Sequence, residues 1–189
     1  MKLATSTGDF GRYADNVFDL IDCFDSTGFC YLDYNFDNTM SNRMLTAPDY
    51  KEQFLRLRDY AAQKGYTFVQ SHAPFDSNLY RTDVPPFTDE FREWFDESVK
   101  RSIIASARLG VKWVVTHAQT ATIDAEMSRD YNLKINREFY SPYLELAKKV
   151  GTGIAVENMA EFHPAKTKRR FTATVEEQIA IIDDFADPD

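Results

Sequence analysis

Four stretches of the chain carry apolar residues at the three- and four-residue spacing that predicts an amphipathic helix. Their apolar members are Tyr13, Val17, Leu20, Ile21 and Phe24; Phe91, Phe95, Val99 and Ile103; Phe139, Tyr143, Leu146, Ala147 and Val150; and Val175, Ile179, Ile182 and Phe185. At the start of the last stretch, Thr174 and Glu177 have the spacing of a capping box. We expect all four apolar stripes to pack into the core.

Five short apolar segments alternate with the helical stretches and are typical of β-strands. They cover residues 3–6, 29–33, 67–71, 113–116 and 154–156. Four of them follow a glycine that suits the left-handed position at the end of a helix, namely Gly28, Gly65, Gly110 and Gly151. These glycines recur every 37 to 45 residues, about the length of one strand, one helix and their loops.

Strands that alternate with helices predict a parallel sheet with right-handed crossovers. Several of the strands are apolar without strict alternation, as expected for parallel strands covered on both faces. The strand-to-helix loops 73–86 and 118–132 are much longer than the usual length of about 2–6 residues. The sequence therefore predicts one α/β domain over residues 1–189, with its functional site at the carboxyl ends of the strands.

Three of the predicted strands end in residues that can bind a metal ion. His72 follows the third strand, His117 the fourth and Glu157 the fifth. Neighbouring parallel strands lie about 4.8 Å apart, so side chains at matched ends can converge on one point. Imidazole and carboxylate suit divalent zinc, manganese, iron or cobalt. A single histidine at a strand end is more often structural, but two of the three histidines in the chain end successive strands, which favours a metal site.

The third histidine, His163, lies in a long loop that continues through Lys166, Lys168, Arg169 and Arg170. This basic cluster could hold a phosphate or carboxylate group through charge-assisted hydrogen bonds. Runs of charge are more often solvated surface, and we expect a solvated loop here.

Composition narrows the class of protein. The net charge of -8 weighs against nucleic acid and anionic membranes as partners. No apolar run approaches the roughly 20 residues of a membrane-spanning helix, and the first residues lack the apolar core of a signal peptide, so we expect a cytoplasmic protein. Cys23 and Cys30 form neither a CxxC pair nor a disulfide framework, and we expect both thiols to be packed. P-loop, dinucleotide-binding and GxSxG motifs are missing from the sequence.

Three segments at these strand ends resemble the xylose isomerase-like barrel superfamily, which includes sugar-phosphate isomerases and epimerases and the endonuclease IV group. The segments are Ser71-His72-Ala73-Pro74-Phe75, Val115-Thr116-His117-Ala118 and Ala155-Val156-Glu157-Asn158-Met159. The resemblance implies a parallel (β/α) barrel with a divalent zinc, manganese, magnesium or cobalt ion at the carboxyl ends of its strands. It implies that Glu157 is a metal ligand and catalytic residue. His72 and His117 would bind the metal or the substrate, and Asn158 the substrate.

The barrel of that superfamily has eight strand-helix units, and the pattern in this chain supplies about five. The Asp-x-Gly-His segment and the later His and Glu ligands of the superfamily have no counterparts here. We therefore expect the N-terminal part of such a barrel, truncated after the fifth unit. Its unpaired strand edges would favour a homo-oligomer. An open five-stranded flavodoxin-like sheet is the alternative architecture.

Three functional hypotheses follow. The first is a metal-dependent isomerase or epimerase of a small sugar or sugar phosphate, in which proton abstraction gives a metal-stabilised enediolate. Its second acid/base would come from the missing units, so the chain alone could be inactive. The second is an endonuclease IV-like phosphodiesterase, which the histidines permit and the negative charge argues against. The third is a truncated domain that binds a ligand or partner without catalysis.

Overall fold

The computed structural model describes residues 3–123, 128–159 and 169–185. Its strands are β1 (Ala4–Ser6), β2 (Tyr31–Asn35), β3 (Thr67–His72), β4 (Trp113–His117) and β5 (Gly153–Glu157). Its helices are the 3-10 helix η1 (Thr7–Tyr13) and the α-helices α1 (Val17–Asp22), α2 (Thr39–Thr46), α3 (Tyr50–Gln63), α4 (Asp89–Leu109), α5 (Arg129–Val150) and α6 (Val175–Phe185). All five predicted strands are present, within two residues of their expected bounds. Over the described residues, no helix is both long and apolar enough to cross a membrane.

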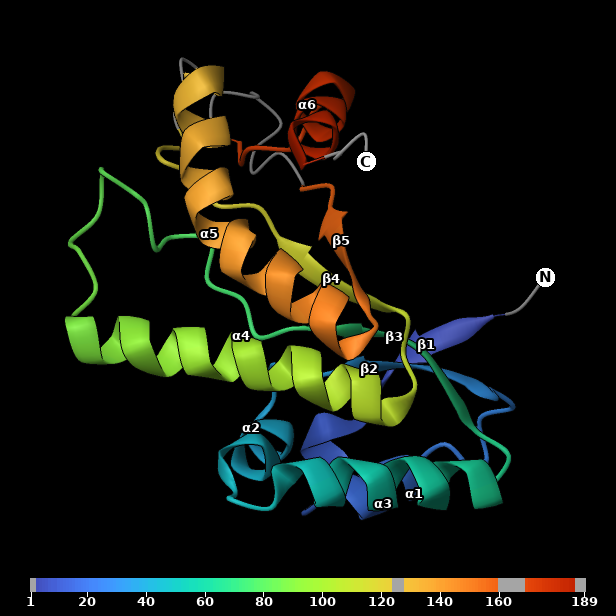
Figure 1. Ribbon diagram of the computed structural model, residues 1–189. Coiled ribbons are helices and arrows are strands. Elements are labelled where there is room, and N and C mark those ends of the chain that lie inside the picture. The colour runs from blue at the N-terminus through green and yellow to red at the C-terminus, as the bar shows by residue number, and fades with distance from the viewer. Residues whose placement is uncertain (1–2, 124–127, 160–168, 186–189) are drawn as a thin grey trace.

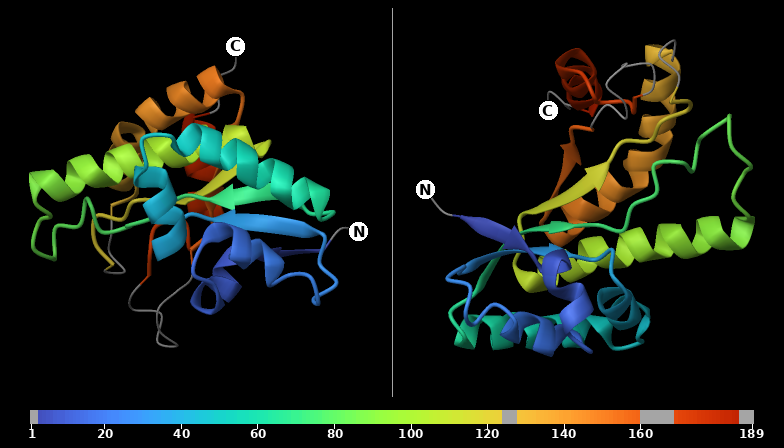
Figure 2. Two further views of the ribbon diagram at one scale, coloured as in Figure 1. Left: turned by 90° about the horizontal axis from the view of Figure 1, so that it is seen from below. Right: turned by 180° about the vertical axis from the view of Figure 1, so that it is seen from behind.

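The five strands form one parallel sheet in the order β1-β2-β3-β4-β5. Helices α3, α4 and α5 lie along one side of this twisted sheet (Figure 1), and Figure 2 shows the same arrangement from below and from behind. Strands that follow one another in sequence order are the arrangement of a (β/α) barrel, whereas a doubly wound sheet reverses its order at a switch point. The flavodoxin-like alternative is therefore wrong, and the sheet is an open part of a barrel.

Short glycine turns lead from the helices into the strands. Gly110 and Gly151 end α4 and α5 with φ of 79° and 83°, and Gly28 and Gly65 have φ of 78° and 87°. A residue with a Cβ is strained in this left-handed region, so glycine is required for the tight exit from each helix. The long connections consequently follow the strands, as predicted, and gather at their carboxyl ends.

Two apolar clusters fill the space between the sheet and the helices. One joins β2 and β3 to α1, α2, α3 and α4, and the other joins β4 and β5 to α4, α5 and α6. Most members of the first three predicted stripes are buried, namely Val17, Leu20, Ile21, Phe24, Phe95, Val99, Ile103, Phe139, Tyr143 and Ala147. The helical periodicity therefore identified the core-facing sides of α1, α4 and α5.

The prediction that the stripe on α6 packs into the core holds for Phe185, which packs against the second apolar cluster, and is wrong for its other three members. Val175, Ile179 and Ile182 are 69%, 52% and 52% exposed, whereas Ala180 and Ile181 are buried. The helix therefore packs against α5, where Phe185 meets the ring of Tyr140, and leaves Val175, Ile179 and Ile182 accessible to solvent.

Three smaller expectations also change. Tyr13 is exposed at the end of η1, so the first apolar stripe begins only in α1. Cys23 is half-buried and Cys30 is exposed, and the packing prediction is wrong for Cys30. At the start of α6, the Thr174 hydroxyl accepts a hydrogen bond from the Glu177 N–H at 3.3 Å, while the Glu177 carboxylate binds an arginine. One half of the predicted capping box is therefore formed.

Candidate metal centre

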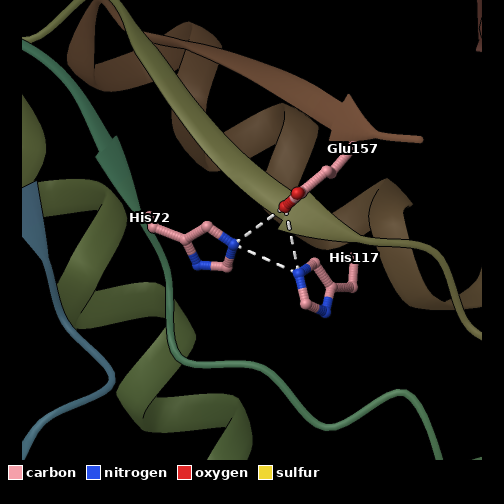
Figure 3. A group of neighbouring side chains, drawn as sticks. All are labelled: His72, His117 and Glu157. Carbon is pink, nitrogen blue, oxygen red and sulfur yellow. Dashed lines mark hydrogen bonds and ion pairs between the residues drawn. The ribbon is translucent and has the colours of Figure 1, made fainter. Parts of the chain in front are cut away.

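The carboxyl ends of β3, β4 and β5 bring three predicted site residues together (Figure 3). In the β4–β5 pairing His117 lies opposite Glu157, and in the β3–β4 pairing His72 lies opposite Val115. Val115 precedes His117 by two residues, and side chains two apart on a strand share a face. His72, His117 and Glu157, hereafter the triad, therefore project from the same face of the sheet.

The three facing atoms of the triad form a nearly equilateral triangle. Oε2 of Glu157 lies 3.1 Å from Nε2 of His72 and 3.1 Å from Nε2 of His117, and the two nitrogens are 3.2 Å apart. In a tetrahedral zinc site with ligands at about 2.0–2.1 Å, neighbouring ligand atoms lie about 3.3 Å apart. The triangle therefore has the size of one face of such a tetrahedron.

The hydrogen bond of His72 fixes which of its nitrogens can bind a metal. Nδ1 of His72 lies 2.8 Å from the carbonyl oxygen of Ala73, which can only accept, so Nδ1 carries the proton. In the neutral ring Nε2 then presents a lone pair to Oε2 of Glu157 and Nε2 of His117. Lone pairs that face one another at this distance are stabilised by a cation between them. The donor set therefore fits a divalent metal ion.

The surroundings of the triad keep the imidazole of His117 neutral. The side chains of His72 and His117 are only 14% and 12% exposed, against 44% for Glu157. Burial and then the neighbouring His72 lower the pKa of His117 to about 4, against the opposing effect of Glu157. The ring of Phe75 covers the pair, 4.1 Å from the His117 ring and 5.3 Å from the His72 ring. At neutral pH His117 is thus in the form that binds metals.

A buried hydroxyl immediately before each histidine fastens its strand to a helix. The Ser71 hydroxyl lies 2.7 Å from the Ser106 hydroxyl of α4, and the Thr116 hydroxyl donates to the Tyr140 oxygen of α5 at 3.0 Å. Because side chains alternate along a strand, these hydroxyls point to the helices while the histidines point to the opposite face. The hydrogen bonds of these hydroxyls to α4 and α5 therefore fix the strand ends that carry the two histidines.

Two asparagines of α5 hold the loop that follows His117. Oδ1 of Asn136 accepts from the N–H of Gln119 at 2.8 Å, and its Nδ2 donates to the Gln119 carbonyl at 2.9 Å. One turn earlier, Oδ1 of Asn132 accepts from the N–H of Ala121 at 3.0 Å. Both asparagines are fully buried. These side chains, hereafter the asparagine clamp, replace the partners that the loop backbone would otherwise lack.

The remaining sequence-predicted site residues lie elsewhere. Asn158 is exposed just beyond β5 and is not part of the triad. His163, Lys166 and Lys168 of the basic cluster lie outside the described residues.

The two arginines of that cluster are described, and the expectation of a solvated loop is wrong for both. Nη1 of Arg169 donates to both carboxylate oxygens of Glu177, at 2.6 and 2.5 Å, and the Arg169 side chain is 18% exposed. Arg170 is half-buried and lines a pocket beside the triad. The run of charged residues in the sequence did not reveal this burial, because burial depends on tertiary contacts such as the one between Arg169 and Glu177.

Sequence reasoning also missed Asp33 of β2. Its Oδ2 accepts from Nε2 of Gln70 at 3.0 Å, and within the described residues its buried Oδ1 has no hydrogen-bond partner. Burial raises the pKa of Asp33 against the hydrogen bond from Gln70, and the nearby Glu157 raises it further. The available signal was an acidic residue at the end of the apolar segment 29–33.

No family model and no curated protein matches this sequence. The fold is nevertheless that of the xylose isomerase-like barrels, as the solved structures that match it show. They include a putative xylose isomerase from Rhodospirillum rubrum, with a TM-score of 0.69 and 17% identity over 98% of this chain and 62% of that chain. A D-tagatose 3-epimerase-like protein has a TM-score of 0.66 and 20% identity over 99% of this chain and 62% of that one. The IolI protein with a bound zinc atom has a TM-score of 0.63 and 15% identity over 97% and 58%.

These likenesses establish the predicted fold. The chain spans about three-fifths of the length of the barrels it matches.

Proposed function

We propose that this protein is a metal-dependent isomerase or epimerase of a small sugar or sugar phosphate. The observation that carries the proposal is the convergence of two imidazole nitrogens and one carboxylate oxygen within 3.2 Å at the carboxyl ends of three parallel strands. The likeness to barrels described as sugar epimerases and a xylose isomerase supports it, as does the zinc atom of the IolI structure.

The residues of the triad would have two roles in such a reaction, metal binding and proton transfer. Nε2 of His72 and Nε2 of His117 would hold the ion together with Oε2 of Glu157. A bound divalent ion supplies polarisation of a carbonyl and an adjacent hydroxyl of a sugar. The half-exposed Glu157 is also the group that can take a proton from the carbon that bears this hydroxyl, next to the carbonyl. The Phe75 ring shields the imidazoles from water, and the exposed amide of Asn158 is available to substrate hydroxyls.

Solvent exchange tests this proposal without knowledge of the substrate. The protein is incubated in D2O with Mn2+, Co2+ or Zn2+ and a panel of aldoses, ketoses and their phosphates, and deuterium at the carbon next to the carbonyl is followed by NMR. We expect metal-dependent exchange that falls at least 100-fold in Glu157→Gln. The matched control Glu52→Gln, an exposed position on α3, should retain it. Equal exchange in both variants would contradict the role of Glu157.

An endonuclease IV-like phosphodiesterase is the second candidate. The observation that favours it is the presence of two imidazoles in one ligand set, a combination that suits zinc. The net charge of -8 opposes a nucleic-acid substrate. Cleavage of a fluorescently labelled abasic duplex in the presence of Zn2+ would favour this candidate, and an intact duplex the isomerase.

A further inference from the structure

Residues 169–172, which precede α6, are anchored from both sides beside the triad. The Phe171 side chain is fully buried in the second apolar cluster, and its N–H donates to the Thr120 hydroxyl at 3.0 Å. The N–H of Arg169 donates to the carbonyl of Ile123 at 3.0 Å. Thr120 lies in the loop that the asparagine clamp holds, between Gln119 and Ala121. The position of this segment is therefore tied to α5 through the loop after His117.

The next residue ties the same segment to β5. The Thr172 hydroxyl donates to the carbonyl of Glu157 at 3.1 Å, and the Thr172 carbonyl accepts from the N–H of Met159 at 3.1 Å. Thr172 has φ of 72°, a left-handed conformation that costs a β-branched residue about 1–3 kcal/mol. Strain of this kind persists where surrounding contacts impose it, and it often accompanies a functional site.

Arg170 lies between these two anchors and lines a pocket of 220 Å³ that also includes His117 of the triad. Phe75, Asn78 and Met159 contribute to the same lining. The pocket is therefore continuous with the candidate metal centre, and a molecule bound at the triad can extend toward the Arg170 guanidinium.

The two arginines of this segment have different surroundings. Arg169 is neutralised by its two contacts with Glu177. Arg170 lies near Asp76, which lines the same pocket, and near a second guanidinium, Arg81. Arg81 is in turn paired with Asp83. Burial and then Arg81 lower the pKa of Arg170, and Asp76 opposes them. A half-buried guanidinium repelled by another is a position that an anion stabilises.

We propose that Arg170 binds an oxyanion of the substrate, a carboxylate or a phosphate monoester, in the pocket beside His117. This inference rests on the proposed function and narrows it, because it selects acidic sugars and sugar phosphates over neutral sugars. Arg170 is then a specificity-determining residue. Its planar fork of donors can bind two oxygens of either group at once.

Small probes test the subsite separately from catalysis. Glycerol 3-phosphate, glycerate and glycerol are titrated into the EDTA-treated protein and followed by calorimetry and NMR. We expect one or both anionic probes to bind at least tenfold more tightly than glycerol, and the comparison of phosphate with carboxylate identifies the preferred group. Arg170→Gln should remove this preference, and Arg170→Lys should keep part of it. The exposed control Arg56→Gln on α3 should bind as the wild type does.

Two results would overturn the inference. One is equal binding of charged and neutral probes by the wild type, and the other is unchanged binding of the anionic probes in Arg170→Gln. Far-UV circular dichroism checks that Arg170→Gln is folded, and Arg170→Lys supplies a charge-preserving comparison. Cobalt binding, measured in parallel, separates this inference from the proposed function. Anion binding without metal binding would retain the subsite and remove the metal-dependent reaction.

Discussion

At the scale of single residues, the two histidines of the triad are arranged for metal binding in different ways. His72 is fixed by the hydrogen bond from its Nδ1 to the Ala73 carbonyl, which directs its Nε2 lone pair at the candidate ion. His117 is kept neutral by burial and by the neighbouring imidazole, which lower its pKa. Within the described residues, Nδ1 of His117 is buried without a hydrogen-bond partner. A protonated His117 is therefore unfavourable in the folded, metal-free protein.

This difference predicts an acid-sensitive stability. The pKa of His117 is about 4 in the folded chain and about 6.5 in an unfolded one, so the unfolded chain binds more protons between these values. The free energy of unfolding should therefore fall as the pH is lowered through this window. Between pH 7 and pH 5 we expect a loss of about 2 kcal/mol from this residue, measured by urea unfolding in EDTA. His117→Gln should lose correspondingly less, and an equal loss in both proteins would contradict the account.

The strand ends made the triad predictable from the sequence, because a chemical group directly after an apolar strand has a defined place. Arg170 and Asp33 could not be assigned in the same way. The burial of Arg170 depends on the anchoring of Phe171 by Thr120, a residue 51 positions earlier in the chain. The proximity of Asp33 to the triad depends on the pairing of β2 with β3. Both are consequences of tertiary structure.

At the scale of secondary structure elements, α5 does more than cover the sheet. Its asparagine clamp supplies hydrogen bonds to the loop after His117, and that loop in turn holds Phe171. Asparagine is a poor helix former, so two of them one turn apart on a buried helix face indicate a role outside the helix. The clamp therefore connects the loop after β4 to the segment that carries Arg170.

Asn136→Ala should destabilise the protein by about 2–4 kcal/mol, because it leaves the buried N–H and carbonyl of Gln119 without their partners. The loss is measured by urea unfolding. Asn42→Ala, at a half-buried position on α2, is the matched control and should cost less than about 1 kcal/mol. A similar cost at both positions would mean that the clamp adds nothing beyond ordinary helical packing.

The elements were not equally readable in the sequence. The strands of a parallel sheet are apolar on both faces and therefore stand out. Helix α2 was missed because its eight residues offer only two turns of periodicity, and its start depends on the Asn38 side chain, which accepts from the N–H of Ser41. The periodicity of α6 correctly predicted a helix, but its described neighbours leave Val175, Ile179 and Ile182 exposed.

At the scale of the whole molecule, the described sheet is open. Its edge strands are β1 and β5, and the stripe Val175, Ile179 and Ile182 on α6 is exposed near β5. Open strand edges and contiguous apolar side chains both favour association between chains. The chain spans about three-fifths of the length of the barrels that it matches. These 189 residues on their own should therefore not behave as an inert monomer.

We expect this chain to associate with a second copy as its concentration is raised, measured by size-exclusion chromatography with light scattering. The double variant Ile179→Glu with Ile182→Glu should shift the equilibrium to the monomer, because charge on the stripe opposes its burial. The control Tyr131→Glu changes an exposed aromatic residue of α5 and should leave the association unchanged. A wild-type chain that is monomeric at every concentration would contradict this expectation.

The central claim is that the triad binds a divalent metal ion, and titration with Co2+ under visible absorption tests it most directly. The account predicts one equivalent bound per chain, with the intense absorption of a four-coordinate site. The affinity should fall at least tenfold in His72→Ala, His117→Ala and Glu157→Gln. His163→Ala, which alters the remaining histidine of the chain, should bind as the wild type does. Absence of binding, or equal affinity in the triad variants and the wild type, would contradict the claim.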